Sequence, residues 1–151
     1  MSKIENQLSK LESKISSESI LNPAISKSPV GWHIEHTLLT INRIIEALQY
    51  SNPNNYKWRF NFTKLIVFAI KKIPRGRAKS PDVVVPKVYN AESLSLHVQR
   101  TKNKITELDK LTNDKYFHHP FFGDLRLKQA ITFLEIHTNH HLKIINDILR
   151  N

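Results

Sequence analysis

Apolar residues recur every three or four positions through much of this chain, a spacing typical of amphipathic helices. The first such segment covers residues 3–20, and the second runs from residue 30 to residue 48. A Ser/Pro-rich connection separates them, with Ser28 as a candidate N-cap and Pro29 at the first helical position. The second segment carries a strong helical stripe made of Ile34, Leu38, Ile41, Ile45 and Leu48.

Three more helices are predicted further along the chain. Residues 60–72 are apolar enough for a short helix, although a strand at 65–70 fits the same run. A longer helix is predicted over residues 91–111, and residues 118–123 are expected to form a loop. Asp124 is then a candidate N-cap for a long last helix.

The fold class that these segments predict is all-α. The chain has three glycines, helical periodicity in every long segment and no regular strand pattern, so four or five helices around one core are the simplest arrangement. Its 151 residues match the length of one domain, here residues 1–151. Residues 74–90 contain three prolines and are expected to form a long basic loop; loops of this length are often functional.

Composition excludes several kinds of site. The chain has no cysteine, which rules out disulfides, iron–sulfur clusters, thiolate zinc sites and a cysteine nucleophile. Gly31, Gly76 and Gly123 are too far apart for a glycine-rich phosphate-binding loop. The longest apolar run, residues 65–70, is much shorter than a membrane span, and the first residues lack the apolar core of a signal peptide. We therefore expect a cytoplasmic protein with no membrane partner.

The net charge of +10 comes mostly from one segment. Between Ala47 and Pro81 there are eight basic residues and no acidic one. Three interpretations are open: a solvated loop that keeps the protein soluble, a field that attracts anionic substrates, or a nucleic-acid surface with Tyr56 or Trp58 stacked on bases. Because the charge is local, it argues against general affinity for nucleic acid.

The last predicted helix carries three histidines, His137, His140 and His141. His137 and His141 are four residues apart and share a face with Leu134 and Ile145, so both imidazoles are expected to point into the bundle. His140 lies at the edge of that stripe. Two histidines at this spacing can bind one metal ion, and the alternative is a pair of hydrogen-bonded core histidines. Unpartnered burial would cost about 1–3 kcal/mol for each polar group.

A third ligand for such a site would come from the second helical segment, in the run Trp32-His33-Ile34-Glu35-His36. His36 lies off-centre on the apolar stripe of that helix, and His33 lies to the other side of it. Spacing alone does not decide between these two histidines.

Four segments of the sequence carry a resemblance to a known family. They are Val30–Leu38, Lys72–Gly76, His119–Leu125 and the His-rich Phe133–Leu142. Together they resemble the DinB-like superfamily, and more narrowly a bacterial branch of it without an assigned reaction. The resemblance extends from about residue 28 to residue 149, and the closing His-rich helix is its most specific part.

The resemblance implies an up-down-down-up four-helix bundle with a metal ion at one end. The family's three histidine ligands fall on His36, which the likeness favours over His33, and on His137 and His141. Three imidazoles suit a divalent ion, Zn²⁺ or Ni²⁺ before Mn²⁺ or Fe²⁺, with an open position that could bind a thiolate or activate water. No general base stands out, and His140 is a weak candidate for a catalytic residue.

The family includes thiol-dependent S-transferases, so the resemblance implies a metal-dependent transferase or hydrolase that acts on a small, anionic molecule. A low-molecular-weight thiol is the expected co-substrate, and the pairing of bundles in the family implies a homodimer. The alternative is a basic, non-enzymatic binding module for nucleic acid or another polyanion, with a structural metal.

Overall fold

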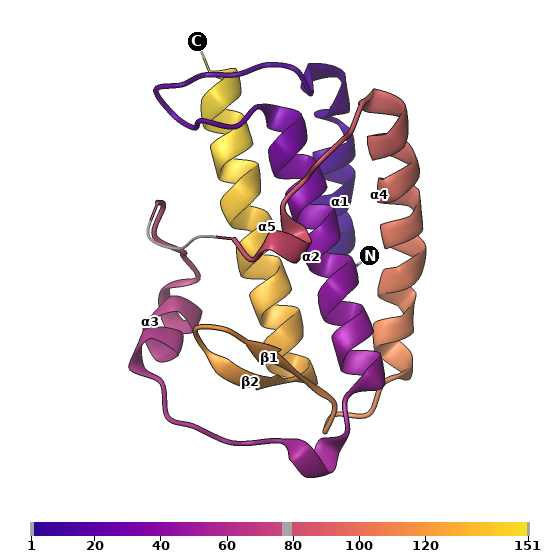
Figure 1. Ribbon diagram of the computed structural model, residues 1–151, viewed down its shortest axis with the longest axis vertical. Coiled ribbons are helices and arrows are strands. Elements are labelled where there is room, and N and C mark those ends of the chain that lie inside the picture. Colours follow the sequence, from indigo (N-terminus) through magenta and orange to yellow (C-terminus); the bar gives the residue numbers. More distant parts are fainter. Residues whose placement is uncertain (1, 77–79, 151) are drawn as a thin grey trace.

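The computed structural model describes residues 2–76 and 80–150, and these residues are mostly helical (Figure 1). They form five α-helices and one two-stranded antiparallel sheet. The helices are α1 (Lys3–Glu12), α2 (Val30–Tyr50), α3 (Phe62–Ile70), α4 (Ala91–Ile105) and α5 (Leu127–Leu149). The strands are β1 (Tyr116–His119) and β2 (Gly123–Arg126). The helix-rich fold is confirmed, and its up-down-down-up order stays a prediction.

Four of the helices pack around a common core. The helix α2 contacts α4 and α5, and α1 contacts the same two helices. The stripe predicted for α2 faces inward, because its five apolar side chains have no exposed surface: Ile34, Leu38, Ile41, Ile45 and Leu48. Leu134 and Ile145 of α5 belong to the same buried cluster. The helical periodicity of the sequence therefore located the core.

The helix ends differ from the predicted ones by a few residues. Pro29, not Ser28, is the N-cap of α2. The first predicted helix is divided, since α1 ends at Glu12 and a short 3-10 helix follows at Ile15–Ser17. The helix α4 likewise passes into a 3-10 helix at Thr106–Lys110. Within the described ranges, no helix combines the length and the apolar character needed to cross a membrane.

A β-hairpin stands where the sequence predicts a loop, so the fold is not strictly all-α. In the antiparallel pair β1 and β2, His118 lies opposite Asp124, and its Nδ1 is 2.8 Å from a carboxylate oxygen of that residue. Gly123 turns the chain with a φ of 72°, which glycine adopts without strain. Asp124 therefore lies in β2 and does not cap α5, whose N-cap is Arg126. Four residues per strand are too few to give a recognisable period of two.

The apolar segment at residues 60–72, for which a strand was the alternative, forms the helix α3. The helix α3 ends when Lys71 takes a left-handed φ of 52°, so the chain turns before it reaches Pro74. Further along, the 3-10 helix Asp82–Val84 lies across α2 and buries Val84 (Figure 1). Arg77 and Lys79 of the expected basic loop lie outside the described residues.

Candidate metal centre

Three histidines from two helices meet inside the bundle. His36 comes from α2, and His137 and His141 come from successive turns of α5. One ring nitrogen of each lies within 4.8 Å of the other two. The ring of His141 is centred 4.7 Å from that of His36 and 4.6 Å from that of His137. Three nitrogen donors at these separations could hold one metal ion.

Two contacts fix the ring of His36. Its Nδ1 lies 2.8 Å from the backbone carbonyl oxygen of Val84 and is buried there, so Nδ1 carries the hydrogen and donates it. The indole ring of Trp32 stacks on the imidazole with a centroid separation of 4.9 Å and an interplanar angle of 10°. Nε2 is left with a free lone pair, and a backbone carbonyl is a usual partner for the other nitrogen of a ligating histidine.

His141 is held by a second histidine. Its Nδ1 is 3.0 Å from Nδ1 of His33, and Nε2 of His33 is 2.9 Å from the hydroxyl oxygen of Ser26. When His141 donates to His33, and His33 donates to Ser26, Nε2 of His141 has a free lone pair. His33, the alternative ligand in the sequence, thus lies beside the cluster as a hydrogen-bond partner of His141.

His137 provides the strongest sign that a ligand belongs at this site. Among the described residues, its Nδ1 is buried and has no hydrogen-bond partner. An unsatisfied polar atom in the interior costs about 1–3 kcal/mol, which a protein rarely tolerates without a reason. A metal ion bound at Nδ1 would give this nitrogen a partner, so the residues present fit such an ion.

Burial keeps these imidazoles neutral. Burial lowers the pKa of His36, and burial reinforced by neighbouring imidazoles lowers the pKa of His137 and His141 well below the usual value of 6.5. The pKa of His33 and that of His140 are lowered to about 4, again chiefly by burial. Metal ligation by histidine requires the neutral ring, and the cluster meets that requirement at pH 7.

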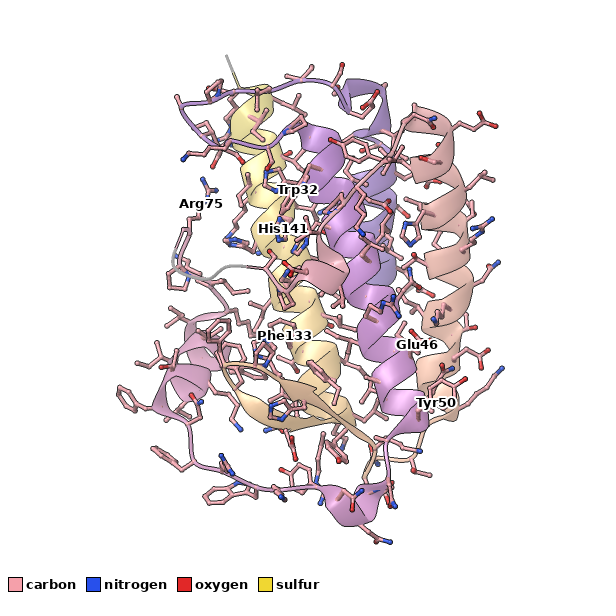
Figure 2. All side chains as sticks on the ribbon, in the orientation of Figure 1. Trp32, Glu46, Tyr50, Arg75, Phe133 and His141 are labelled. Atoms are coloured by element: carbon pink, nitrogen blue, oxygen red, sulfur yellow. The ribbon has the colours of Figure 1, made fainter. Side chains whose placement is uncertain are left out.

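A basic hollow of about 260 Å³ lies beside the cluster. It is formed by α5 and the segment that follows α3, and it includes His140, whose ring is centred 5.1 Å from that of His141. Its lining has no carboxylate and contains four cationic side chains: Lys71, Lys72, Arg75 and Lys143. Figure 2 shows Arg75 at the edge of the molecule, on the side of α5 away from α2. Arg75 also pairs with Asp147 at 2.7 Å, and the excess positive charge of the lining suits a small anion.

The three remaining histidines lie in other parts of the fold. Nδ1 of His97, on α4, is 2.9 Å from a carboxylate oxygen of Glu35. His118 is exposed and pairs with Asp124 across the hairpin. His119 lies at the hairpin tip, where it shapes the turn before α5.

The contacts of His119 show how it shapes the turn at the hairpin tip. Its Nδ1 accepts hydrogen bonds from the backbone N–H groups of Phe121 and Phe122, at 3.1 and 3.2 Å. The imidazole also stacks on the ring of Phe122 at a centroid distance of 4.3 Å. Burial, followed by the charge of His118, lowers the pKa of His119 to about 4. Protonation at Nδ1 would remove the acceptor that both backbone groups use.

We expect His119→Leu to destabilise the protein at pH 7 by about 1–3 kcal/mol, because two backbone N–H groups lose their acceptor. The folded-state pKa of about 4 lies below the unfolded value of 6.5, so this histidine's stabilisation is present above pH 6.5 and is lost as the pH falls toward 4. The variant should therefore lose less stability over that interval. Urea unfolding across this pH range measures both effects, and Leu96→Ser, at an exposed position of α4, is the control. An unchanged pH slope in His119→Leu would contradict the assignment.

Two functional contacts could not be identified from the sequence. The carbonyl of Val84 holds His36, although the only signal was an apolar Val83-Val84-Val85 run inside a polar loop. Ser26 lies in the Ser/Pro-rich connection and reaches His33 only because that connection folds back over the start of α2. Neither a backbone carbonyl acceptor nor a loop hydroxyl can be recognised from a sequence motif.

Comparison with known proteins is consistent with this geometry. A sequence model described as the DinB superfamily matches residues 7–145, a range that includes all three clustered histidines. No curated protein and no solved structure shows significant similarity to the chain.

Proposed function

Because the chain belongs to the DinB superfamily, whose members bind metals, we propose that it is a metal-binding protein and that His36, His137 and His141 hold its ion. The observation that carries this proposal is the group of three neutral, clustered imidazoles, one of them with a buried and unpartnered nitrogen. Trp32, Val84 and His33 orient the rings. Zn²⁺ or Ni²⁺ suits three nitrogen donors best.

We further propose a metal-dependent enzyme of the thiol-transferase or hydrolase type. A divalent ion held by three histidines supplies Lewis acidity and an open position for a thiolate, a carbonyl oxygen or water. The basic hollow beside the cluster supports a small, anionic substrate, since Arg75 and Lys143 line it together with His140. His140 is neutral at pH 7, with a pKa lowered to about 4, and it is our candidate for accepting a proton from the substrate.

Metal analysis of untagged protein tests the proposed site. After dialysis against Zn²⁺ or Ni²⁺, the wild type should retain about one ion per chain by inductively coupled plasma mass spectrometry. His97→Ala, which removes a histidine outside the cluster, should retain the same amount. Protein without stoichiometric metal under either condition would overturn the proposal.

A spectroscopic experiment separates the two reaction types. Co²⁺ is loaded in place of the native ion, and a small thiol such as cysteine is titrated in. A thiolate-to-cobalt absorption band in the near ultraviolet supports the transferase type. Unchanged cobalt spectra at saturating thiol favour the hydrolase type.

A further inference from the structure

The helix α3 presents its most apolar face to solvent. Phe62, Leu65, Ile66 and Ile70 are 65, 57, 42 and 55% exposed, and their spacing places them on one side of the helix. The opposite side packs inward through buried Val67 and half-buried Phe68. The structure therefore leaves the four side chains of the outer face largely in solvent.

The exposed surface continues into the chain before α3. Trp58 and Phe60 are 71 and 70% exposed. The side chain of Asn61 donates a hydrogen bond to the carbonyl of Phe121 at 2.7 Å, which ties this stretch to the hairpin tip. We call the six exposed apolar residues the α3 face: Trp58, Phe60, Phe62, Leu65, Ile66 and Ile70. Single exposed apolar residues are ordinary, whereas a group of this kind marks an interaction surface.

Basic side chains surround the α3 face. Lys57 and Arg59 alternate with its aromatic residues and are exposed, and Lys71 and Lys72 follow its last residue. The sequence has no acidic residue between Ala47 and Pro81. A second copy of the chain in a two-fold contact would bring this positive charge against itself. The exposed apolar side chains and the basic side chains around them together favour an anionic partner with an apolar interior.

We propose that the α3 face docks onto an anionic lipid membrane. The helix α3 would lie in the plane of the interface with its apolar side chains among the acyl chains, and Lys57, Arg59, Lys71 and Lys72 would contact lipid phosphates. Tryptophan is enriched at membrane interfaces, and phenylalanine is typical of the apolar face of interfacial helices. The sequence led us to expect no membrane partner because it lacks a spanning segment, but an interfacial helix needs none.

The docked orientation would place the basic hollow near the lipid surface. Lys71 and Lys72 belong both to the rim of the α3 face and to the lining of the basic hollow. The docking itself does not depend on a metal ion, since none of the three clustered histidines is part of the α3 face. Binding to vesicles and binding of metal can therefore fail independently.

Vesicle sedimentation tests the proposal. The wild type should bind vesicles of equimolar phosphatidylglycerol and phosphatidylcholine, and it should not bind vesicles of phosphatidylcholine alone. The triple variant Phe62→Ser/Leu65→Ser/Ile66→Ser should bind at least about tenfold more weakly, because three large apolar side chains leave the lipid. Leu96→Ser is the matched control, since Leu96 on α4 is 53% exposed and lies outside the α3 face.

The charge requirement is tested with Lys57→Ala/Arg59→Ala. We expect affinity to fall at least about tenfold, because each basic residue contributes favourable electrostatic energy at an anionic surface. The control is Lys10→Ala, at an exposed position of α1. Circular dichroism checks that every variant is folded.

Three results would overturn the proposal. One is equal binding to the two kinds of vesicle, or binding to neither. Another is a dimer, seen by light scattering, that the triple serine variant abolishes while vesicle binding is unaffected, which would assign the face to a second copy. The third is tight, salt-sensitive binding to duplex DNA by wild type and triple serine variant alike, without binding to vesicles, which would assign the basic residues to nucleic acid.

Discussion

Replacing His137 by alanine is expected to lower the affinity for Zn²⁺ by more than about 100-fold. Loss of a partner that only orients a ligand costs about 10–100-fold in metal affinity, and loss of a proposed ligand should cost more. Two imidazoles, those of His36 and His141, would remain at the site. Competition with a chelator of known affinity measures the change.

The same substitution should destabilise the metal-free protein less than an ordinary large-to-small change in the core. His137 carries a buried nitrogen without a hydrogen-bond partner, so its removal deletes an unsatisfied polar atom and partly offsets the cavity that is created. A chelator should therefore lower the melting temperature of the wild type, since the ion stabilises only the folded state. It should leave the melting temperature of His137→Ala unchanged. A variant that retained wild-type zinc affinity would contradict the ligand assignment.

Much of the helical core follows from the spacing of apolar residues. The stripe on α2 and the pair His137 and His141 could be placed because a helix repeats every 3.6 residues, and the structure has them on inward faces. His36 was separated from His33 only by resemblance to a family. The physical reason now visible is that His33 is engaged on both ring nitrogens, with His141 and Ser26.

Other features depend on tertiary contacts that no local pattern encodes. The hairpin closes through His118 opposite Asp124 and a glycine turn, within two strands of four residues each. The carbonyl of Val84 reaches His36 from a residue 48 positions away. The exposure of the α3 face could not be predicted either. Apolar periodicity shows that a helix has an apolar face, but it does not show whether another element covers that face.

The neighbours of the cluster divide into two sets with different roles. Trp32, Val84 and His33 contact the rings and restrict their orientation. His140, Arg75 and Lys143 line the hollow that we propose receives the substrate. Substitutions in the first set should change metal affinity, whereas substitutions in the second should leave the ion bound and change the binding of small molecules.

His33→Ala gives the sharpest test of the first set, and we expect it to lower zinc affinity by about 10–100-fold. Nδ1 of His141 lies 3.0 Å from Nδ1 of His33, so alanine removes the acceptor that keeps the hydrogen on Nδ1 of His141 and its lone pair on Nε2. The other tautomer, with the hydrogen on Nε2, cannot bind through that nitrogen. The ring of His141 would also gain freedom to rotate.

A conservative variant separates this positioning role from general damage to the core. The amide oxygen of His33→Gln can accept the same hydrogen bond, so we expect this variant to recover most of the lost affinity. His97→Ala is the control for loss of a partly buried, hydrogen-bonded histidine elsewhere, and it should bind zinc as the wild type does. Calorimetric titration of metal-free proteins at pH 7 measures all four affinities. Equal weakening in His33→Ala and His33→Gln would show that the hydrogen bond to His141 does not control the site.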